Sequence, residues 1–413
     1  MQLADGYKQT EVGVIPEDWE SAFLGDVADI RMCKRIFSDQ TNPTGDIPFF
    51  KIGTFGGIPD VFIPFALYHE YRWKYSFPSK GDILLSAAGT LGKTVVYDGH
   101  DAYFQDSNIV WLDVNKQRIA NEYLYQCYQQ IEWASPEGST ISRLYNGIIR
   151  ATKIPLPPLA EQRAIAEALS NVDALINALD ALITKKRHIK QGTMQQLLTG
   201  KKRLPGFSGE WEEKTLGDLG HCIRGVSYNG SSDLSSTDTD CTCRLLRSNN
   251  VQQHQIVRED MQFVNHERVS EHQKLRDSDI VICMANGSKT LVGKAGLFRA
   301  SDSYEYTFGA FMGCFRTEPA RADAQFVSLF LQSGPYRQFL QVLLAGSSIN
   351  NLKPSDIESI DLRLPDAGEQ AAISEVLSDM DAEITALEQK RDKTKLIKQG
   401  MMQELLTGKT RLI

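Results

Sequence analysis

The feature that most constrains this 413-residue sequence is that it repeats itself. Residues Glu161–Leu204 align with Glu369–Leu412 without a gap, and 26 of these 44 pairs are identical. The two halves also open alike, because WESAFLGDV from Trp19 corresponds to WEEKTLGDL from Trp211. Solenoid repeats are only about 20–50 residues long, so this is instead one module of about 200 residues used twice. The chain is therefore predicted to contain two similar folded units.

The similarity between the halves is uneven. Their ends are nearly the same, whereas their middles share only short matches, such as Gly81–Leu85 with Ser278–Ile282. A constant frame with two divergent inserts is typical of a protein that reads two different targets in one geometry. The sequence leaves an alternative open, in which the middles of a duplicated scaffold drifted without consequence.

Each half ends in a segment with the apolar spacing of a coiled coil. Apolar residues recur at steps of four and three, which is the a/d pattern of helices that pack along a shared seam. The predicted seam residues are Ile165, Leu169, Val172, Ile176, Leu179 and Ile183, followed by Ile373, Leu377, Met380, Ile384 and Leu387. Gly200 and Gly408 are placed to cap helices of about 40 residues, or roughly 60 Å. We expect the two helices to pair antiparallel; the alternative is that each helix packs only on its own module.

The segments that precede these helices are predicted to be mixed α/β (α+β). Short β-branched and apolar runs bounded by Gly, Pro and Asp are typical of strands, and longer amphipathic runs of helices. The expected strands are 47–52, 82–87, 93–98, 108–114, 279–284 and 309–315, and the expected helices are 121–134 and 324–333. The predicted pseudo-two-fold organisation is a first module at 1–153, a central helix at 154–204, a second module at 205–361 and a C-terminal helix at 362–413.

Composition limits the classes of partner. The formal net charge of −7 argues against a protein that coats nucleic acid indiscriminately, although local basic patches can still bind it. The sequence has no apolar run of about 20 residues and no signal-peptide pattern, so a cytoplasmic protein is expected. Seven cysteines without a C-x-x-C pair indicate free thiols rather than zinc ligands or disulfides.

Basic, aromatic and amide side chains concentrate in segments interpreted as loops of both modules. Arg or Lys pairs with guanine and Asn or Gln with adenine, while Lys and the amides of Gly-rich turns suit phosphates. The candidate DNA-binding residues are Arg31, Lys34, Arg35, Arg72, Lys74, Thr90, Lys93 and Arg143 in the first half, and Arg224, Tyr228, Arg244, Arg247, Asn249, Asn250, Lys289, Lys294 and Lys353 in the second.

One segment matches a nucleotide-binding pattern. AAGTLGKT at Ala87–Thr94 fits the loose P-loop motif, and IVWLD ending at Asp113 resembles the acidic strand that holds magnesium. The sequence after Thr94 is β-branched rather than helical, and the second half lacks the motif, so an NTPase using Lys93, Thr94 and Asp113 is the less favoured alternative. No methyltransferase or nuclease motif and no metal-ligand cluster is found, so no catalytic residue is predicted.

These motifs together resemble the specificity (S) subunit of type I restriction–modification systems. The resemblance covers essentially the full length and rests on the duplication, PLPPLAEQRAIAEALSNVDALI, the IKQG-M-Q-LLTGK-RL ends, the W-x4-LGD openings and GDIPFFKIGTF. It is weak at 30–45 and 225–275. It implies two target-recognition domains, each reading one half of a bipartite DNA site, and two helices that set the spacer. A coiled-coil adaptor without a DNA role is a third hypothesis.

The resemblance also implies partners. Two methyltransferase (modification) subunits would bind this chain and methylate adenine with S-adenosylmethionine, and motor–nuclease (restriction) subunits using ATP and Mg²⁺ are further candidates. The chain itself is expected to bind double-stranded DNA, to hold no cofactor or metal, and to catalyse nothing. Because bases in a duplex are stacked, the methyltransferase must flip its target base out.

Overall fold

The computed structural model describes residues 5–133, 143–345 and 350–412. The chain forms two compact units. The first unit consists of residues 1–180 and 389–413, and the second consists of residues 181–388. Among the helices within the described ranges, none is long and apolar enough to cross a membrane.

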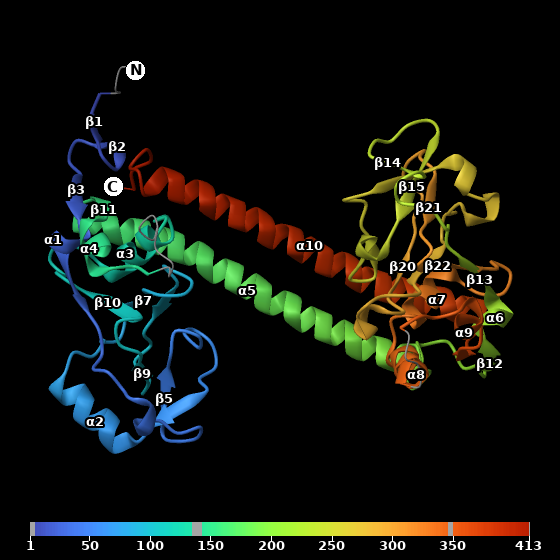
Figure 1. The fold of residues 1–413 in the computed structure, drawn as a ribbon, viewed down its shortest axis with the longest axis horizontal. Helices are drawn as coiled ribbons and strands as arrows, with labels where there is room; N and C mark the ends of the chain where they lie inside the picture. Colours follow the sequence, from blue (N-terminus) through green and yellow to red (C-terminus); the bar gives the residue numbers. More distant parts are fainter. Residues whose placement is uncertain (1–4, 134–142, 346–349, 413) are drawn as a thin grey trace. The chain divides into compact units, whose positions relative to one another are not determined.

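The first unit is built around a four-stranded antiparallel sheet (Figure 1), and the side chains of its inner strand Ile83–Ser86 are buried on both faces. Its strand order is β4 (Ala28–Arg31), β10 (Ile109–Val114), β7 (Ile83–Ser86) and β8 (Thr94–Val96). Side chains alternate between the faces, so Ile83 and Leu85 enter one core and Leu84 enters the other. The second core is closed by helix α2 (Phe65–Lys74) and by a three-stranded sheet. The strand order of this sheet is β6 (Val61–Ile63), β5 (Ile47–Phe50) and β9 (Tyr103–Phe104).

The second unit repeats this topology. Its four-stranded sheet has the order β13 (Gly220–Arg224), β22 (Met312–Thr317), β19 (Ile280–Cys283) and β20 (Ala295–Leu297). A further sheet has the order β14 (Leu234–Ser235), β18 (Gln262–Asn265), β15 (Thr242–Leu246) and β21 (Tyr306–Phe308), and β16 (Val251–Gln252) pairs with β17 (Gln255–Ile256). In both units one pair is parallel, β5 with β9 and β15 with β21.

Each module also contains short strands and helices besides these sheets. In the first unit they are β3 (Glu20–Phe23), which pairs with β11 (Lys153–Leu156), and α1 (Leu24–Val27), α3 (Asn121–Tyr128) and α4 (Asn146–Ala151). In the second they are β12 (Glu212–Thr215), which pairs with β23 (Asp361–Leu364), and α6 (Leu216–Leu219), α7 (Ala324–Phe330), α8 (Gly334–Ala345) and α9 (Pro354–Glu358). A hairpin of β1 (Tyr7–Thr10) and β2 (Gly13–Pro16) begins the first unit. The predicted mixed α/β duplication is confirmed.

The two long helices are α5 (Leu159–Leu197) and α10 (Ala367–Leu405), each of 39 residues. Ion pairs show that they run antiparallel within each unit. The pairs are Lys398–Asp173 (2.7 Å) and Arg391–Asp180 (3.3 Å) in the first unit, and Lys190–Asp381 (2.6 Å) and Lys186–Glu383 (2.6 Å) in the second. Lys190 and Asp173 correspond to Lys398 and Asp381 in the 208-residue repeat. The pairs Lys398–Asp173 and Lys190–Asp381 are therefore equivalent.

The predicted seam combines both packing modes that the spacing allowed. The seam residues nearest the start of each helix belong to the core of a module. These are Ile165 and Leu169 in the first unit, and Ile373 and Leu377 in the second. The inner members Ile176, Leu179, Ile183 and Ile384 are buried outside those clusters. Val172, Met380 and Leu387 are only half-buried, and Arg391 replaces an apolar residue where it pairs with Asp180.

A buried carboxylate anchors the start of each long helix. Glu161 has no exposed surface and accepts bonds from Arg411 Nε (2.6 Å), Arg411 Nη2 (2.8 Å) and the Trp19 indole (2.9 Å). In the second unit Glu369 makes the same contacts with Arg203 and Trp211. The guanidinium of Arg411 also lowers the pKa of Asp18. In each unit, an arginine that follows the C-terminal end of one long helix therefore binds a glutamate at the start of the other long helix.

Several local predictions were wrong. Arg72 and Lys74, which were expected in a loop, lie in the last turn of α2, because Tyr68 and Tyr71 pack one face of this helix on the second core. The predicted helix 121–134 ends at Tyr128, and residue 134 lies outside the described residues. The strand expected at 309–315 begins only at Met312, and α8 was not predicted at all. The caps at Gly200 and Gly408 are confirmed by positive φ angles of 68° and 70°.

Candidate nucleic-acid interface

The second unit has a cavity of about 950 Å³ among loops at one edge of its sheets. We call it the Arg–Asn cavity because guanidinium and amide groups dominate its lining. Its main polar lining residues are Arg224, Arg247, Asn249, Asp260, Asn286 and Asn351. They come from the end of β13, the segment after β15, the segment before β18, the turn after β19 and the segment before α9. The size is within the usual range for ligand sites.

Hydrogen bonds organise this polar lining. Asp260 accepts from Arg247 Nη2 (3.2 Å) and Asn249 Nδ2 (3.1 Å). Arg224 donates to the Leu352 carbonyl (2.8 Å) and to Asn351 Oδ1 (3.1 Å). Arg247 Nε is buried and has no hydrogen-bond partner among the described residues. These hydrogen bonds hold the lining side chains in place, while the Asp260 side chain stays 82% exposed.

Two aromatic side chains also line the cavity. Phe311, in the turn between β21 and β22, is 69% exposed, and Tyr228 is half-buried. Both rings border the polar lining residues, so a planar ligand in the cavity could contact them. Planar rings stack on nucleobases, because every base presents a π face.

The first unit brings candidate residues together at the equivalent place. The backbone bridge of Ala88 with Arg143 corresponds to that of Ala285 with Asn351, since residues 143 and 351 are 208 positions apart. Arg143 donates to the Ser107 carbonyl (3.2 Å), and Arg35 pairs with the neighbouring Asp106 (2.8 Å). Predicted residues of the first module thus also converge at one site, with different chemistry from the second.

Three of the candidate DNA-binding lysines donate to backbone carbonyls of the protein. Lys93 donates to the Phe55 carbonyl, and the equivalent Lys294 donates to the Ser248 carbonyl. Partial burial also lowers the pKa of Lys294. Lys289 similarly donates to the Leu344 carbonyl (3.1 Å). These amines position loops beside the candidate sites, while the exposed Thr90 lies in the Gly-rich turn itself.

The nucleotide-binding alternative is wrong on geometry. Residues 94–96 form strand β8 rather than the helix that a P-loop needs, so no helix N-terminus meets a phosphate. Asp113 lies on β10, which is antiparallel to its neighbours, and its carboxylate is 3.5 Å from Arg31 Nε.

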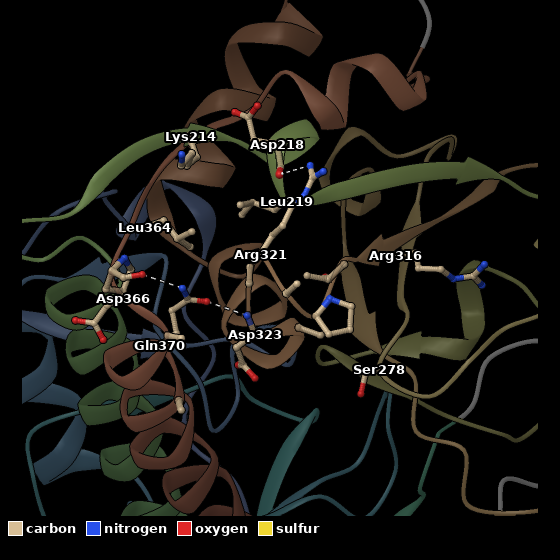
Figure 2. A pocket seen from close by; sticks show the side chains of 18 of the residues that line it. Lys214, Asp218, Leu219, Ser278, Arg316, Arg321, Asp323, Leu364, Asp366 and Gln370 are labelled. Carbon is tan, nitrogen blue, oxygen red and sulfur yellow. Dashed lines mark hydrogen bonds between the residues drawn. The ribbon is translucent and has the colours of Figure 1, made fainter.

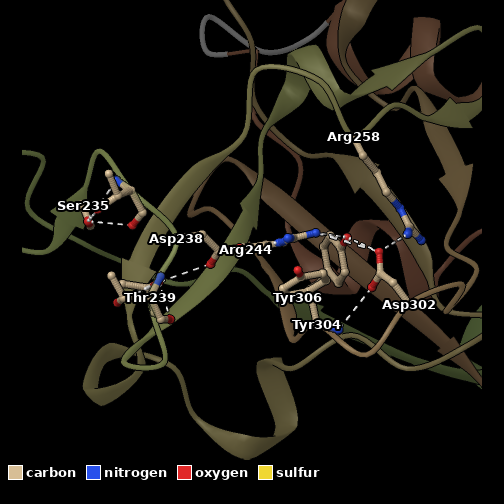
Figure 3. Close-up of polar contacts among 10 residues, drawn as sticks. Ser235, Asp238, Thr239, Arg244, Arg258, Asp302, Tyr304 and Tyr306 are labelled. Carbon is tan, nitrogen blue, oxygen red and sulfur yellow. Dashed lines mark hydrogen bonds and ion pairs between the residues drawn. The ribbon is translucent and has the colours of Figure 1, made fainter.

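Arg244 is held inside the second unit by a polar network (Figure 3). Its guanidinium pairs with Asp238 (2.9 Å), donates to the Tyr306 hydroxyl (3.0 Å) and stacks 3.3 Å from the Tyr304 ring centroid. Asp302 links this group to Arg258 (2.6 Å). Arg244 therefore ties strand β15 to the segment before β21, and its Nε and Nη1 donors have intramolecular partners.

The remaining basic candidates lie apart from these sites or on their borders. Arg72 and Lys74 lie on α2 and pair with Asp101 (3.1 Å) and Glu70 (2.9 Å). Lys34 lies 5.1 Å from the Tyr75 ring centroid, next to the end of α2. Lys353 is exposed at the start of α9, two residues from Asn351 in the Arg–Asn cavity. DNA contact by each of them stays a prediction.

Adjacent asparagines have different environments. Asn250 is fully buried, and its Nδ2 donates to the carbonyls of Val257 (3.1 Å) and Glu259 (2.9 Å). Its Oδ1 accepts from the Arg247 backbone (2.9 Å). Asn250 therefore cannot reach a base unless the domain opens, whereas the exposed Asn249 lines the cavity.

Asn250→Ala is expected to lower the free energy of unfolding by about 1–3 kcal/mol, because buried backbone groups lose their partners. Asn249→Ala should change it by less than about 0.5 kcal/mol, since that side chain is exposed. Chemical denaturation of both variants tests this contrast. Equal stability of the two variants would contradict the structural role assigned to Asn250.

A second cavity of about 1120 Å³ lies elsewhere in the second unit (Figure 2). Its polar groups are largely paired with one another: Gln370 bonds the Pro365 carbonyl (2.8 Å) and the Asp323 backbone (2.8 Å), and Arg321 donates to the Asp218 carbonyl (3.0 Å). None of the predicted DNA-binding residues lines it. We therefore assign the candidate interface to the Arg–Asn cavity.

The cysteines do not contribute to either cavity. All seven thiols are free, as expected, and only Cys241 is exposed. Burial raises the pKa of the Cys243 thiol to about 12, so it stays protonated at neutral pH. Within the described residues, no cluster of His, Cys, Asp or Glu could hold a metal ion.

Sequence comparisons identify the class. The family model described as the type I restriction modification DNA specificity domain matches residues 16–190 and 208–396. The chain is 33% identical over 186 residues to the EcoKI specificity subunit of Escherichia coli, and 32% identical over 202 residues to the StySPI specificity subunit of Salmonella potsdam. These matches cover 45% and 48% of this chain, but only 39% and 43% of those proteins.

Two other comparisons span the whole chain. The MjaVIII specificity subunit of Methanocaldococcus jannaschii is 25% identical, with 99% of this chain and 96% of that protein covered. The crystal structure of the S subunit from M. genitalium matches with a TM-score of 0.60 at 15% identity, covering 98% of both chains, which supports the fold alone.

The two modules of one topology therefore correspond to two DNA specificity domains. The chain belongs to the type I restriction modification DNA specificity family, with one family domain in each half. The resemblance predicted from its sequence motifs is thus confirmed.

Proposed function

We propose that this chain is the sequence-reading subunit of a type I restriction–modification complex, and that each module reads one half of a bipartite DNA target. The observation that carries this proposal is that two modules with the same strand order hold different side chains at equivalent positions. Arg143 of the first module corresponds to Asn351 of the second, and these two residues favour different base edges.

In this proposal α5 and α10 set the spacer between the two half-sites. Each helix passes without a break from residues of one unit into residues of the other. A continuous helix is a suitable spacer, because its hydrogen-bonded backbone fixes the rise per residue.

The proposed partners supply the chemistry. Two methyltransferase subunits would methylate adenine with S-adenosylmethionine, and motor–nuclease subunits with ATP and Mg²⁺ would join them for restriction. This chain would contribute recognition and position in the cytoplasm, where the host DNA lies. Its affinity for DNA should fall steeply with salt, because phosphate contacts release counterions.

Mapping of methylated bases in host DNA, with and without this gene, tests the proposal. We expect adenine marks at one split motif with a non-specific spacer, and we expect all of these marks to vanish on deletion. Reintroducing the gene should restore them at the same motif. Marks that are unchanged by deletion would remove the proposal.

A further inference from the structure

Asp260 places a carboxylate at the Arg–Asn cavity. Its side chain is 82% exposed, yet it is held by Arg247 Nη2 (3.2 Å) and Asn249 Nδ2 (3.1 Å). Its backbone has a φ of 50°, a left-handed conformation that Asp adopts more readily than most residues. One side of the carboxylate is thus fixed by the protein, and the exposed side remains available to a ligand.

The first unit has the same pair at the equivalent position. Lys51 Nζ lies 3.0 Å from Asp60 Oδ2, and the Asp60 side chain is 55% exposed. Lys51 directly follows β5 as Arg247 directly follows β15, and both strands end in a parallel pair, Phe50 with Phe104 and Leu246 with Phe308. A basic residue paired with an exposed aspartate therefore recurs in module middles that otherwise diverge.

The chemistry of a carboxylate limits what it can recognise on DNA. An ionised carboxylate only accepts hydrogen bonds, and it repels phosphates. In the major groove the base donors are the N4 amino group of cytosine and the N6 amino group of adenine. The exposed Phe311 ring completes a site that suits the edge and face of a base.

We propose that Asp260 and Asp60 are specificity-determining residues, each of which accepts a hydrogen bond from the amino group of a cytosine or adenine in the half-site of its own module. The neighbouring Arg247 or Lys51 fixes the carboxylate and offsets its repulsion of the DNA backbone. This inference rests on the proposed function, because it assumes that each module reads one half of a split motif.

The test begins with the motif mapped for the wild-type chain in a host that carries the partner subunits. Asp260→Ala should make one cytosine or adenine position degenerate in one half-motif, and Asp60→Ala should do so in the other half. Asp240→Ala is the matched control, because Asp240 is an exposed aspartate of the second unit outside the cavity. It removes the same charge and should leave the motif unchanged.

Base analogues then identify the atom that is read. The assembled complex is tested on motif duplexes in which adenine is replaced by purine, or cytosine by pyrimidin-2-one, so that only the amino group is lost. Wild-type affinity should fall roughly 5- to 150-fold at one position, the usual range for a specific base contact. The Asp260→Ala complex should be indifferent to the analogue at that position, and Asp240→Ala should behave as wild type.

Each result discriminates between the two proposals. If wild-type marks do not depend on this chain, the proposed function fails before Asp260 is tested. If the motif is real but Asp260→Ala and Asp60→Ala keep it unchanged, the carboxylates are not readers. Uniformly weaker binding to every sequence, with no change in discrimination among bases, would likewise overturn the inference.

Discussion

Replacing Glu161 with Ala is expected to lower the free energy of unfolding of the first unit by about 1.5–3 kcal/mol, the usual contribution of hydrogen bonds to a charged group, because Arg411 keeps its pair with Asp18. The variant leaves the Arg411 guanidinium without its main partner and the Trp19 indole N–H without an acceptor. Denaturant unfolding combined with hydrogen exchange measures the loss, and the exchange should increase around β3 and the start of α5.

Two further variants serve as a control and as a test of the equivalent site. Glu167→Ala removes an exposed carboxylate from the same helix and should change stability by less than about 0.5 kcal/mol. Glu369→Ala should reproduce the loss, but with faster exchange in the second unit, where Glu369 binds Arg203 and Trp211. A Glu161→Ala protein as stable as Glu167→Ala would show that the buried carboxylate is not an anchor.

Gly408→Ala should destabilise the first unit by about 2–5 kcal/mol, through two separate effects. The φ of 70° strains a residue with a Cβ by about 1–2 kcal/mol. The new Cβ would also lie 2.4 Å from Pro16 Cδ and 3.2 Å from the Trp19 ring, and overpacking of this kind costs about 1–3 kcal/mol. Thermal unfolding of the purified protein is the direct measurement.

Gly200→Ala separates the two effects. Gly200 occupies the equivalent cap with a φ of 68°, but a Cβ there would meet the Trp211 ring at an ordinary contact distance of 3.4 Å. Gly200→Ala should therefore lower the free energy of unfolding only by the backbone strain, about 1–2 kcal/mol. If both glycine variants are destabilised equally, the contact of Gly408 with Pro16 is not the source of the larger loss.

The sequence predicted the frame of this protein well, because the frame depends on periodicity and repetition. Heptad spacing and glycine caps defined both long helices, and the 208-residue shift predicted two modules. It could not predict α2, because the apolar side of that helix consists of aromatic residues that also suit a loop. Nor could spacing show that Ile165 and Ile373 join module cores rather than an isolated helix pair.

The candidate site was predicted only in part. Arg224, Tyr228, Arg247 and Asn249 do converge on one cavity, as their clustering in the sequence suggested. Asp260 also lines this cavity, but an isolated acidic residue carries no sequence signal for a binding site. Arg244 and Asn250 were included because residue type cannot reveal that a side chain is already bound within the fold.

The pairing of Glu161 with Arg411 has a consequence for biosynthesis, since these residues are 250 positions apart. At about 5–20 residues per second, a ribosome needs roughly 12–50 s to pass from one to the other. Residues 181–388 are contiguous and can fold within that interval, whereas the first unit still lacks the Arg411 partner of Glu161. The module translated first is thus the last to be completed.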